Sequence, residues 1–280
     1  MSNTDQQAFW TDQAGPIWVA QMAAMDTKLS PVLDALLARA NLSPGAQVLD
    51  IGCGAGTSTL AAARAVGETG AARGFDISEP LLAQAKARAT GQPNVSFTIG
   101  DAQDCDFPPA TFDVMISRFG VMFFEDTTAA FANIARALKP GGRLIFATWG
   151  AISENPYFTM PAGVAKAQIG AVPKSDPDAP GPFAMRDTAR VTSMLHDAGL
   201  IAITAEAVPL ILTPPGDAAA VAQLLCEIGP AHGALTYFNA SAADRDRLIT
   251  ALTSALAPFE TPQGIRIPAL INFFSAQKPD

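Results

Sequence analysis

The sequence is poor in cysteine, in histidine and in positive charge. It has 3 Cys and 2 His, and 18 Lys+Arg against 26 Asp+Glu give a formal net charge of −8. Because Cys53, Cys105 and Cys226 are sparse, odd in number and without CxxC spacing, they fit reduced thiols and neither a disulfide framework nor a zinc site. An acidic chain has no basic field that attracts phosphate or anionic lipid, so we expect no nucleic-acid partner. Because the cysteine spacing does not fit a zinc site, we expect no bound metal either.

Long hydrophobic runs and targeting signals are also missing. No apolar stretch approaches the roughly 18 residues of a membrane-spanning helix. The first residues, MSNTDQQAFW, are polar and acidic where a signal peptide is basic and then apolar. We therefore expect a cytoplasmic protein without membrane insertion. What the sequence does have is 49% hydrophobic residues among 280, which suits one large domain or two small ones.

The stretch from Gln47 to Thr148 alternates short β-rich runs with longer Ala-rich runs of helical periodicity. Strands are predicted at Gln47–Ile51, Ala72–Asp76, Val95–Ile99, Phe112–Ser117 and Arg143–Thr148. Helices are predicted at Thr57–Val66, Pro80–Thr90 and Asp126–Leu138, the last of which ends at a Pro-Gly-Gly turn. Four crossovers in about one hundred residues predict a doubly wound α/β core around a parallel sheet.

Both flanks of this core are predicted to cover it. Residues 1–43 are expected to form an N-terminal helical flap from two helices, Asp5–Met25 and Pro31–Ala40. The Pro- and Gly-rich stretch Gly150–Pro182 reads as a long loop, a feature that usually serves a site. We expect substrate-covering insertions at about 150–185 and 216–262, the second of them mostly helical with a break at Gly229-Pro230.

Three alternate glycines follow the first predicted strand. Gly52, Gly54 and Gly56 stand between the strand and the helix predicted from Thr57. Glycines there permit positive φ and let the backbone approach a ligand where any Cβ would collide. In an open parallel sheet this place is the crevice beyond the strand carboxyl ends. A tight strand-to-helix connection without a ligand is the competing interpretation.

Three acidic residues are expected to face the same crevice. Asp76 ends the second predicted strand, about 20 residues after the glycines, where a carboxylate binds a ribose diol. Asp101 follows the third strand and is placed to accept a hydrogen from an exocyclic amine. Asp50 lies inside the first strand, where an unpaired carboxylate is costly, so it is expected to face a cationic group or backbone donors. Three acids without Lys or Arg disfavour a pyrophosphate and favour a positively charged nucleoside.

The chain here resembles the class I S-adenosylmethionine-dependent methyltransferases, and among them the ubiquinone and menaquinone C-methyltransferase branch. Asp50–Gly56 resembles the first motif of that family and Gly100–Ala102 its adenine segment. Phe112–Val114 and Leu138–Leu144 resemble its fourth strand and the turn into its fifth. The resemblance covers about Pro44 to Trp149. It implies a Rossmann-like sheet of seven strands, mostly parallel with an antiparallel last strand that Gly264–Ser275 would supply. Residues 44–280 would then form the methyltransferase domain.

The resemblance also implies a role for each matching residue. The cofactor would be S-adenosyl-L-methionine, with S-adenosyl-L-homocysteine as its product, and the acceptor a small molecule. The residues so assigned to the cofactor are Gly52, Cys53, Gly54 and Gly56 with Asp50 at the methionine portion, Asp76 at the ribose, Ile77, Leu81, Asp101 and Ala102 at the adenine, and Ser117 with Arg118 beside the methionine. In the flap, Trp10, Gln13 and Trp18 resemble residues that related enzymes fold over the cofactor, although packing of the flap alone explains the two tryptophans equally well.

No residue of the sequence is a convincing general base. Arg118 is a candidate for clamping a substrate acid or for pairing with Glu125. His232 and Tyr157, one in each insertion, are further candidates, with a structural role favoured for His232. His196, near a predicted helix C-terminus, is expected to be structural. At least one member of the apolar cluster Phe119, Met122, Phe123 and Phe124 is expected to face an apolar substrate.

Other functions stay open at this point. A nicotinamide-dependent oxidoreductase would also use a glycine turn and a ribose acid, but its last two glycines are separated by two residues. A regulatory protein that binds the cofactor without turnover would not need a covered substrate cavity. Aminopropyl transfer from a related cofactor would need a further acidic cluster. The acceptor atom and the oligomeric state, a homodimer included, are not set by these residues.

Overall fold

The structure is a computed structural model that describes residues 3–280. A seven-stranded sheet has the strand order β3-β2-β1-β4-β5-β9-β6. The strands are β1 (Gln47–Ile51), β2 (Ala71–Asp76), β3 (Val95–Ile99), β4 (Phe112–Arg118), β5 (Leu138–Trp149), β6 (Ile201–Leu212) and β9 (Ile267–Gln277). Strand β9 is antiparallel to both of its neighbours, whereas β1 to β5 pair in parallel. The predicted doubly wound sheet with an antiparallel last strand is therefore confirmed.

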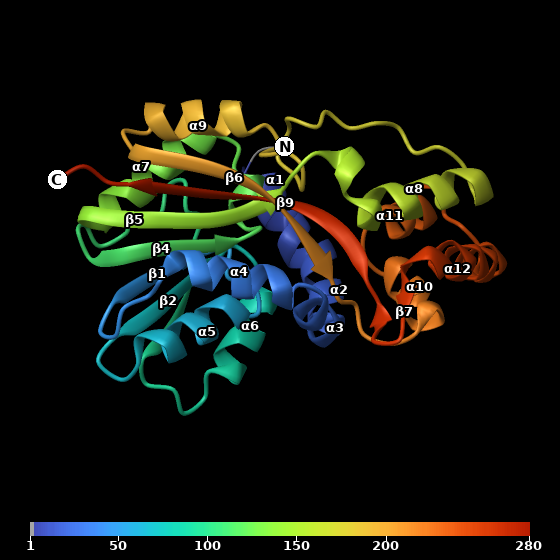
Figure 1. Cartoon of the computed structure of the whole chain (residues 1–280), viewed down its shortest axis with the longest axis horizontal. Helices are drawn as coiled ribbons and strands as arrows, with labels where there is room; N and C mark the ends of the chain where they lie inside the picture. The colour runs from blue at the N-terminus through green and yellow to red at the C-terminus, as the bar shows by residue number, and fades with distance from the viewer. Residues whose placement is uncertain (1–2) are drawn as a thin grey trace.

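Helices cover both faces of the sheet (Figure 1), with α4 (Ser30–Ala40) and α5 (Thr57–Val66) on one face and α7 (Thr127–Ala137) and α9 (Thr188–Asp197) on the other. Helix α6 (Glu79–Arg88) packs on β2 and β3. Side-chain caps fix several helix starts, since Asp126 accepts a hydrogen bond from the Ala129 amide and Asp187 from the Ala189 amide. The core between these layers includes the stacked rings of Phe131, Phe146 and Phe274.

The N-terminal segment divides into two parts with different roles. Helices α1 (Asn3–Ala8), α2 (Ala14–Ala20) and α3 (Met22–Lys28), with a π-helical turn at Phe9–Gln13, form what we call the N-terminal arm. The helix predicted over Asp5–Met25 is thus broken at the π-turn, a feature frequent at functional sites. Helix α4, which we also placed in the flap, packs against β4, β5 and β6 as part of the core.

The second covering unit, which we call the lid, consists of α8 (Pro156–Gln168), α10 (Ala218–Leu225), α11 (Pro230–Tyr237) and α12 (Ala242–Ala255), beside the small hairpin of β7 (Glu260–Thr261) and β8 (Gly264–Ile265). These helices pack on one another beyond one end of the sheet (Figure 1). The loop prediction for Gly150–Pro182 is wrong where α8 forms. Pro156 occupies the first turn, where a missing amide costs nothing, and the helix accommodates Pro161 as well.

Asn155 joins the lid to the sheet. Its side chain accepts a hydrogen bond from the Leu270 amide at 3.1 Å and donates one to the Ala151 carbonyl at 2.8 Å. Leu270 belongs to β9, so the start of α8 is fixed to the antiparallel strand. In the part of the chain that the structure describes, every helix is too short or too polar to cross a bilayer.

Candidate active site

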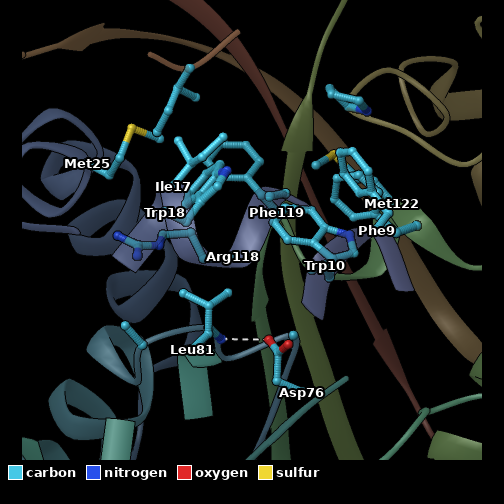
Figure 2. A pocket seen from close by; sticks show the side chains of 18 of the residues that line it. Phe9, Trp10, Ile17, Trp18, Met25, Asp76, Leu81, Arg118, Phe119 and Met122 are labelled. Atoms are coloured by element: carbon cyan, nitrogen blue, oxygen red, sulfur yellow. Dashed lines mark hydrogen bonds between the residues drawn. The ribbon is translucent and has the colours of Figure 1, made fainter. Parts of the chain in front are cut away.

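A cavity of about 740 Å³ lies beyond the carboxyl ends of β1, β2 and β4. The core sheet, the N-terminal arm and the lid all contribute to its wall. Figure 2 shows Asp76 and Leu81 on one side of it, with Trp10 and Trp18 of the arm across from them. A cavity of this size with a mostly apolar wall and a few polar groups is typical of a small-molecule site.

The glycine turn has the backbone that its sequence predicts. Gly52, Gly54 and Gly56 have φ values of +65°, +54° and +83°. A Cβ on Gly52 would lie 2.4 Å from the Gly120 Cα, so this residue allows two chain segments to touch. A Cβ on Gly54 would meet no atom within 4 Å, because that position opens into the cavity. The turn therefore presents free backbone surface to a ligand.

Asp76 lies at the end of β2 and ties the glycine turn to the next helix. Its carboxylate accepts hydrogen bonds from the Gly54 amide at 2.7 Å and from the Ser78 amide at 2.8 Å. Burial raises the pKa of Asp76, against the effect of these backbone donors. The carboxylate also lines the cavity, so it joins the geometry of the turn to the binding of a ligand.

The residues expected around an adenine lie together in the wall. Ile77, Leu81, Asp101 and Ala102 all line the cavity. The Asp101 carboxylate accepts a hydrogen bond from the Gln103 amide at 2.9 Å, and the Asn133 side chain donates to the Ala102 carbonyl at 3.0 Å. The loop after β3 is thereby held in one conformation. Cys53 lines the cavity too, and burial raises the pKa of its thiol, which opposes reactivity.

Three residues assigned to the cofactor lie behind the wall. Asp50, Gly56 and Ser117 are buried and are not among the lining residues. Gly56 packs close to the ring of Phe97, and the Ser117 hydroxyl accepts a hydrogen bond from the Gly120 amide at 3.2 Å. These contacts support the turn from below.

Asp50 is the most buried of these acids. One of its oxygens, Oδ2, accepts hydrogen bonds from Ser58 and Thr59, both at 2.6 Å. Its Oδ1 has no hydrogen-bond partner among the described residues. Burial raises the pKa of Asp50 to about 6, while the two hydroxyl donors work in the opposite direction. Its expected partners, backbone donors or a ligand cation, are replaced by hydroxyl groups of α5.

The N-terminal arm places aromatic and polar side chains over the cavity. Trp10, Gln13 and Trp18 all line it. The Ser78 hydroxyl donates a hydrogen bond to the Trp10 carbonyl at 2.8 Å, which joins the arm to the loop after β2. The rings of Trp10 and Trp18 meet edge to face at 5.8 Å, so each tryptophan both packs within the arm and faces the cavity.

A charged network that the sequence did not indicate closes the arm onto the core. Asp26 of α3 accepts a hydrogen bond from the Thr57 hydroxyl at 2.6 Å and from Arg88 at 3.0 Å. Arg88 also donates to the Ala55 carbonyl in the glycine turn at 2.9 Å. Because Asp26, Arg88 and Thr57 come from three separate elements, no spacing in the sequence could have joined them.

Arg118 reaches into the cavity from the end of β4. One of its nitrogens lies 3.6 Å from Asp26 Oδ1, while NH1 is buried and has no hydrogen-bond partner in residues 3–280. Burial lowers the pKa of Arg118, and Asp26 and Asp50 oppose that shift. The predicted alternative of a pair with Glu125 is not the arrangement found, because the ion pair is made with Asp26. An unpaired guanidinium nitrogen at a cavity wall favours an anionic ligand group.

Lys28 is a second cation of the wall, and sequence reasoning missed it. It ends α3, is 1% exposed, and its Nζ lies 3.7 Å from the centroid of the Tyr157 ring. The available signal was that Lys28 is the one Lys or Arg before Arg39. The Tyr157 hydroxyl is buried without a hydrogen-bond partner in the described chain, and burial raises its pKa.

The rest of the wall is mainly aromatic. Phe119, Met122, Phe123 and Phe124 all line the cavity. Phe119 has a φ of +66° and stacks on Trp149 with ring centroids 4.5 Å apart. His232 of α11 lines the lid side, and its Nδ1 lies 3.3 Å from the Cys226 carbonyl. His196 lies on α9 away from the cavity, with its side chain 80% exposed.

The geometry divides the cavity into two chemical regions. Strand ends supply carboxylates and open backbone that suit a polar nucleoside, while the arm and lid supply rings around Lys28, Arg118 and Tyr157. Such a site can hold a polar cofactor next to an apolar acceptor away from water.

Residues 48–142, about a third of the chain, match the family described as a methyltransferase domain. Nocamycin O-methyltransferase of Saccharothrix syringae is 39% identical over 116 residues, which are 41% of this chain and 41% of that protein. Demethylmenaquinone methyltransferase of Bacillus licheniformis is 35% identical over 105 residues, 38% of this chain and 45% of that protein. The chain thus spans less than half the length of these relatives.

A solved structure extends the similarity over the fold. Phosphoethanolamine N-methyltransferase 2 of Haemonchus contortus, in complex with phosphomonomethylethanolamine and S-adenosylhomocysteine, has a TM-score of 0.55 and 25% identity. The alignment covers 89% of this chain and 52% of that one. The sheet described above is therefore of the Rossmann-like methyltransferase kind.

Proposed function

We infer that the protein is an S-adenosylmethionine-dependent methyltransferase of small molecules, since its residues 48–142 match the family described as a methyltransferase domain. The observation that carries this inference is a single cavity in which the open glycine turn and Asp76 meet an aromatic wall built by the arm and lid. The matched segment supplies the polar side of that cavity and also Phe119, Met122, Phe123 and Phe124 of its aromatic wall, whereas the arm and the lid lie outside the match.

The residues present fit the cofactor. The backbone at Gly54 is open to a ligand, because a Cβ built there would have no atom within 4 Å. The NH1 of Arg118, which has no partner among the described residues, suits a carboxylate such as that of the methionine portion. Asp76 would hold the ribose hydroxyls, and Asp101 with Ala102 the adenine edge between Ile77 and Leu81. Trp10, Gln13 and Trp18 would close over the cofactor from the arm. Three further residues would not contact the cofactor but would hold the glycine turn in place: Asp50, Gly56 and Ser117.

The bound cofactor would supply a methyl group on a sulfonium. The chain would then hold the acceptor in line with that group and exclude water, which is the larger part of the catalysis expected for such a transfer. Asp26 and Arg88 would keep the arm closed during the reaction. The rings of Phe119, Trp149 and Phe158 would hold the apolar body of the acceptor.

The protein is proposed to act in the cytoplasm on a small-molecule acceptor. The aromatic wall supports an acceptor with apolar surface. The net charge of −8 speaks against a nucleic-acid substrate. Three cysteines without a disulfide, Cys53, Cys105 and Cys226, support the reducing compartment. For Cys105, burial and the neighbouring acids raise the pKa to about 12, so its thiol is not a nucleophile candidate.

The experiment is a methyl-transfer screen with cofactor labelled by tritium in its methyl group, preceded by calorimetric titration with S-adenosylhomocysteine. We expect tight binding of S-adenosylhomocysteine and incorporation of label into one acceptor class among phenols, enols, amines and thiols. Binding without any transfer would instead favour a regulatory protein. Binding of a nicotinamide cofactor in place of S-adenosylhomocysteine would favour an oxidoreductase and contradict the proposal.

A further inference from the structure

Lys28 lies on the side of the cavity built by the arm and the lid, which would hold the acceptor. Among the described residues of that side, it is the basic residue without an acidic partner. Its Nζ lies over the face of the Tyr157 ring at 3.7 Å and borders the cavity. Across residues 3–280 no carboxylate pairs with Lys28 and no hydrogen bond is made by its Nζ. A lysine with 1% exposure and no anion is costly, so its presence at a cavity points to a ligand group that meets it.

The position of Lys28 follows from its two neighbours in the fold. Asp26, two residues earlier in α3, is hydrogen bonded to Thr57 at the start of α5, directly after the glycine turn. Tyr157, on the opposite side, belongs to α8 of the lid. Lys28 therefore stands between the turn that receives the cofactor and the helix that covers the acceptor.

The charged and titratable groups around this part of the cavity leave Lys28 without an anion. Arg118 faces it from β4 and Tyr157 from α8, while Glu227 and His232 line the lid side. Glu227 is paired with Arg245, and Asp26 is held by Arg88 and Thr57. Burial first and Arg118 second lower the pKa of Lys28 well below its usual value. Burial at this position favours the neutral amine over the ammonium, and the face of the Tyr157 ring would stabilise an ammonium formed there.

We propose that Lys28 is the general base of the reaction and that the acceptor is therefore an enol or a phenol, a class with an acidic oxygen. The inference rests on the proposed methyltransferase function and specifies its acceptor. The acceptor O–H bond breaks and the Lys28 Nζ–H bond forms, which leaves an oxyanion beside the new ammonium. The oxyanion would supply the electron pair for the new bond to the methyl carbon, at oxygen or at the conjugated carbon, while the bond from the methyl carbon to the sulfonium sulfur breaks and its electron pair stays on the sulfur of S-adenosylhomocysteine. After transfer to carbon, the proton on that carbon would leave and the acceptor oxygen would take a proton back. The ammonium later releases its proton to solvent.

Arg118 disfavours an amine acceptor. Such an acceptor arrives mostly as an ammonium, which the guanidinium of Arg118 repels. A phenol or enol arrives neutral, passes the apolar wall, and gains its charge only next to Lys28. The Tyr157 hydroxyl, unpartnered in the described chain, is free to hydrogen bond to the same oxygen.

The first test uses a coloured probe and no turnover. The protein loaded with S-adenosylhomocysteine is titrated with 4-nitrophenol, whose phenolate is yellow, at a mildly acidic pH where the free probe is largely un-ionised. We expect the bound probe to ionise, with its apparent pKa lowered so that the phenolate fraction rises about tenfold. Lys28→Met should abolish the colour, whereas Lys166→Met on the exposed face of α8 should not. A probe that stays un-ionised in the wild-type cavity would overturn the proposal.

The second test follows methyl transfer. Lys28→Met should lower kcat by about 10²- to 10⁴-fold, the usual contribution of a general base, and activity should return as pH rises past the acceptor's own ionisation. Lys28→Arg should not rescue transfer, because a guanidinium keeps its proton. Thermal unfolding should show that Lys28→Met folds at least as stably as wild type. Label appearing only in amines or thiols, or full rescue by Lys28→Arg, would refute the base. Failure to bind S-adenosylhomocysteine would instead refute the proposed function.

Discussion

The two sides of the cavity are built in different ways. The floor, which we define as Gly52–Gly54, Asp76 and Asp101–Ala102, comes from backbone turns at the ends of neighbouring strands. The roof, which we define as the N-terminal arm and the lid, comes from helices whose contributing residues lie far apart in the sequence. In the floor the main chain itself faces the ligand, whereas in the roof side chains do.

This difference explains how a common floor can serve different acceptors. Strand pairing fixes the floor, because Asp50 pairs with Gly74 and Ile51 with Phe75 in a continuous ladder. The roof has no such ladder, and single hydrogen bonds, such as those from the Thr213 amide to the Lys28 carbonyl and from the Leu270 amide to Asn155, hold it together with side-chain packing. Substitutions in the floor should therefore affect folding and cofactor binding together, whereas substitutions in the roof should affect cofactor affinity or turnover alone.

The largest effect is expected from Gly52→Ala in the floor. A Cβ there lies 2.4 Å from the Gly120 Cα at a φ of +65°, so we expect a loss of about 4 kcal/mol of unfolding free energy from strain and overlap. Urea denaturation measures it. The matched control is Gly163→Ala in α8, where a Cβ meets nothing within 4 Å and a gain of about 0.5 to 1 kcal/mol is expected. Equal stability of the two variants would contradict the distinction between floor and roof.

The second effect is a pH dependence that arises beneath the floor. The pKa of Asp50 is raised from 3.8 to about 6. At pH values between these two, the folded state therefore keeps a proton that the unfolded state has released. Unfolding free energy should therefore fall by roughly 3 kcal/mol as pH rises from about 4 to about 6. Asp50→Asn should flatten this slope while S-adenosylhomocysteine still binds. The measurement is denaturant unfolding across that range, and an unchanged slope in the variant would assign the dependence to other groups.

Asp76→Ala should weaken binding of S-adenosylhomocysteine by about 2 kcal/mol, or roughly 30-fold, because charge-assisted hydrogen bonds to the ribose are lost. It also removes the acceptor of the Gly54 and Ser78 amides, so a smaller loss of stability should accompany it. Calorimetric titration measures the affinity. Asp76→Asn, which keeps one acceptor oxygen, should lie between the variant and the parent. Equal affinity in Asp76→Ala and wild type would remove this residue from the site.

The smallest effect is expected in the roof. Trp18→Leu should weaken S-adenosylmethionine binding by about 1 kcal/mol if its ring faces the sulfonium. S-adenosylhomocysteine has no such charge, so its affinity should change less. Trp18→Phe keeps a ring and should retain most of the difference between the two ligands. An equal loss for both ligands in Trp18→Leu would mean that the ring only packs the arm.

The floor could be read from the sequence because local spacing determines it. The glycines, Asp76 and Asp101 follow consecutive strands, and the carboxyl ends of parallel strands meet at one edge of a sheet. The cost of an unpaired carboxylate inside a strand led us to place Asp50 at a ligand cation or at backbone donors, because the sequence does not show which groups its side chain meets. Its side chain instead meets the hydroxyls of Ser58 and Thr59 in the first turn of α5.

For the roof, the sequence predicted which segments cover the cavity but not how their helices and side chains are arranged. Residues 1–43 and both insertions were expected to cover the site, but α8 was missed because its two prolines suggested a loop. Asp26, Arg88 and Lys28 were missed because their partners come from other elements. Long-range side-chain contacts of this kind leave no periodicity or spacing from which a single sequence reveals them.

The late position of strand β9 in the sequence determines which of the two, floor or roof, can form first during synthesis. It pairs with β5 and β6 from the far end of the described chain, and its Leu270 holds Asn155 at the start of α8. As a nascent chain leaves the ribosome, β1 to β5 can pair early, whereas β6 waits for its only neighbour in the sheet until residue 277 has emerged. Synthesis therefore completes the glycine turn first and anchors α8 last, so a truncated translation product would display the turn without a closed chamber above it.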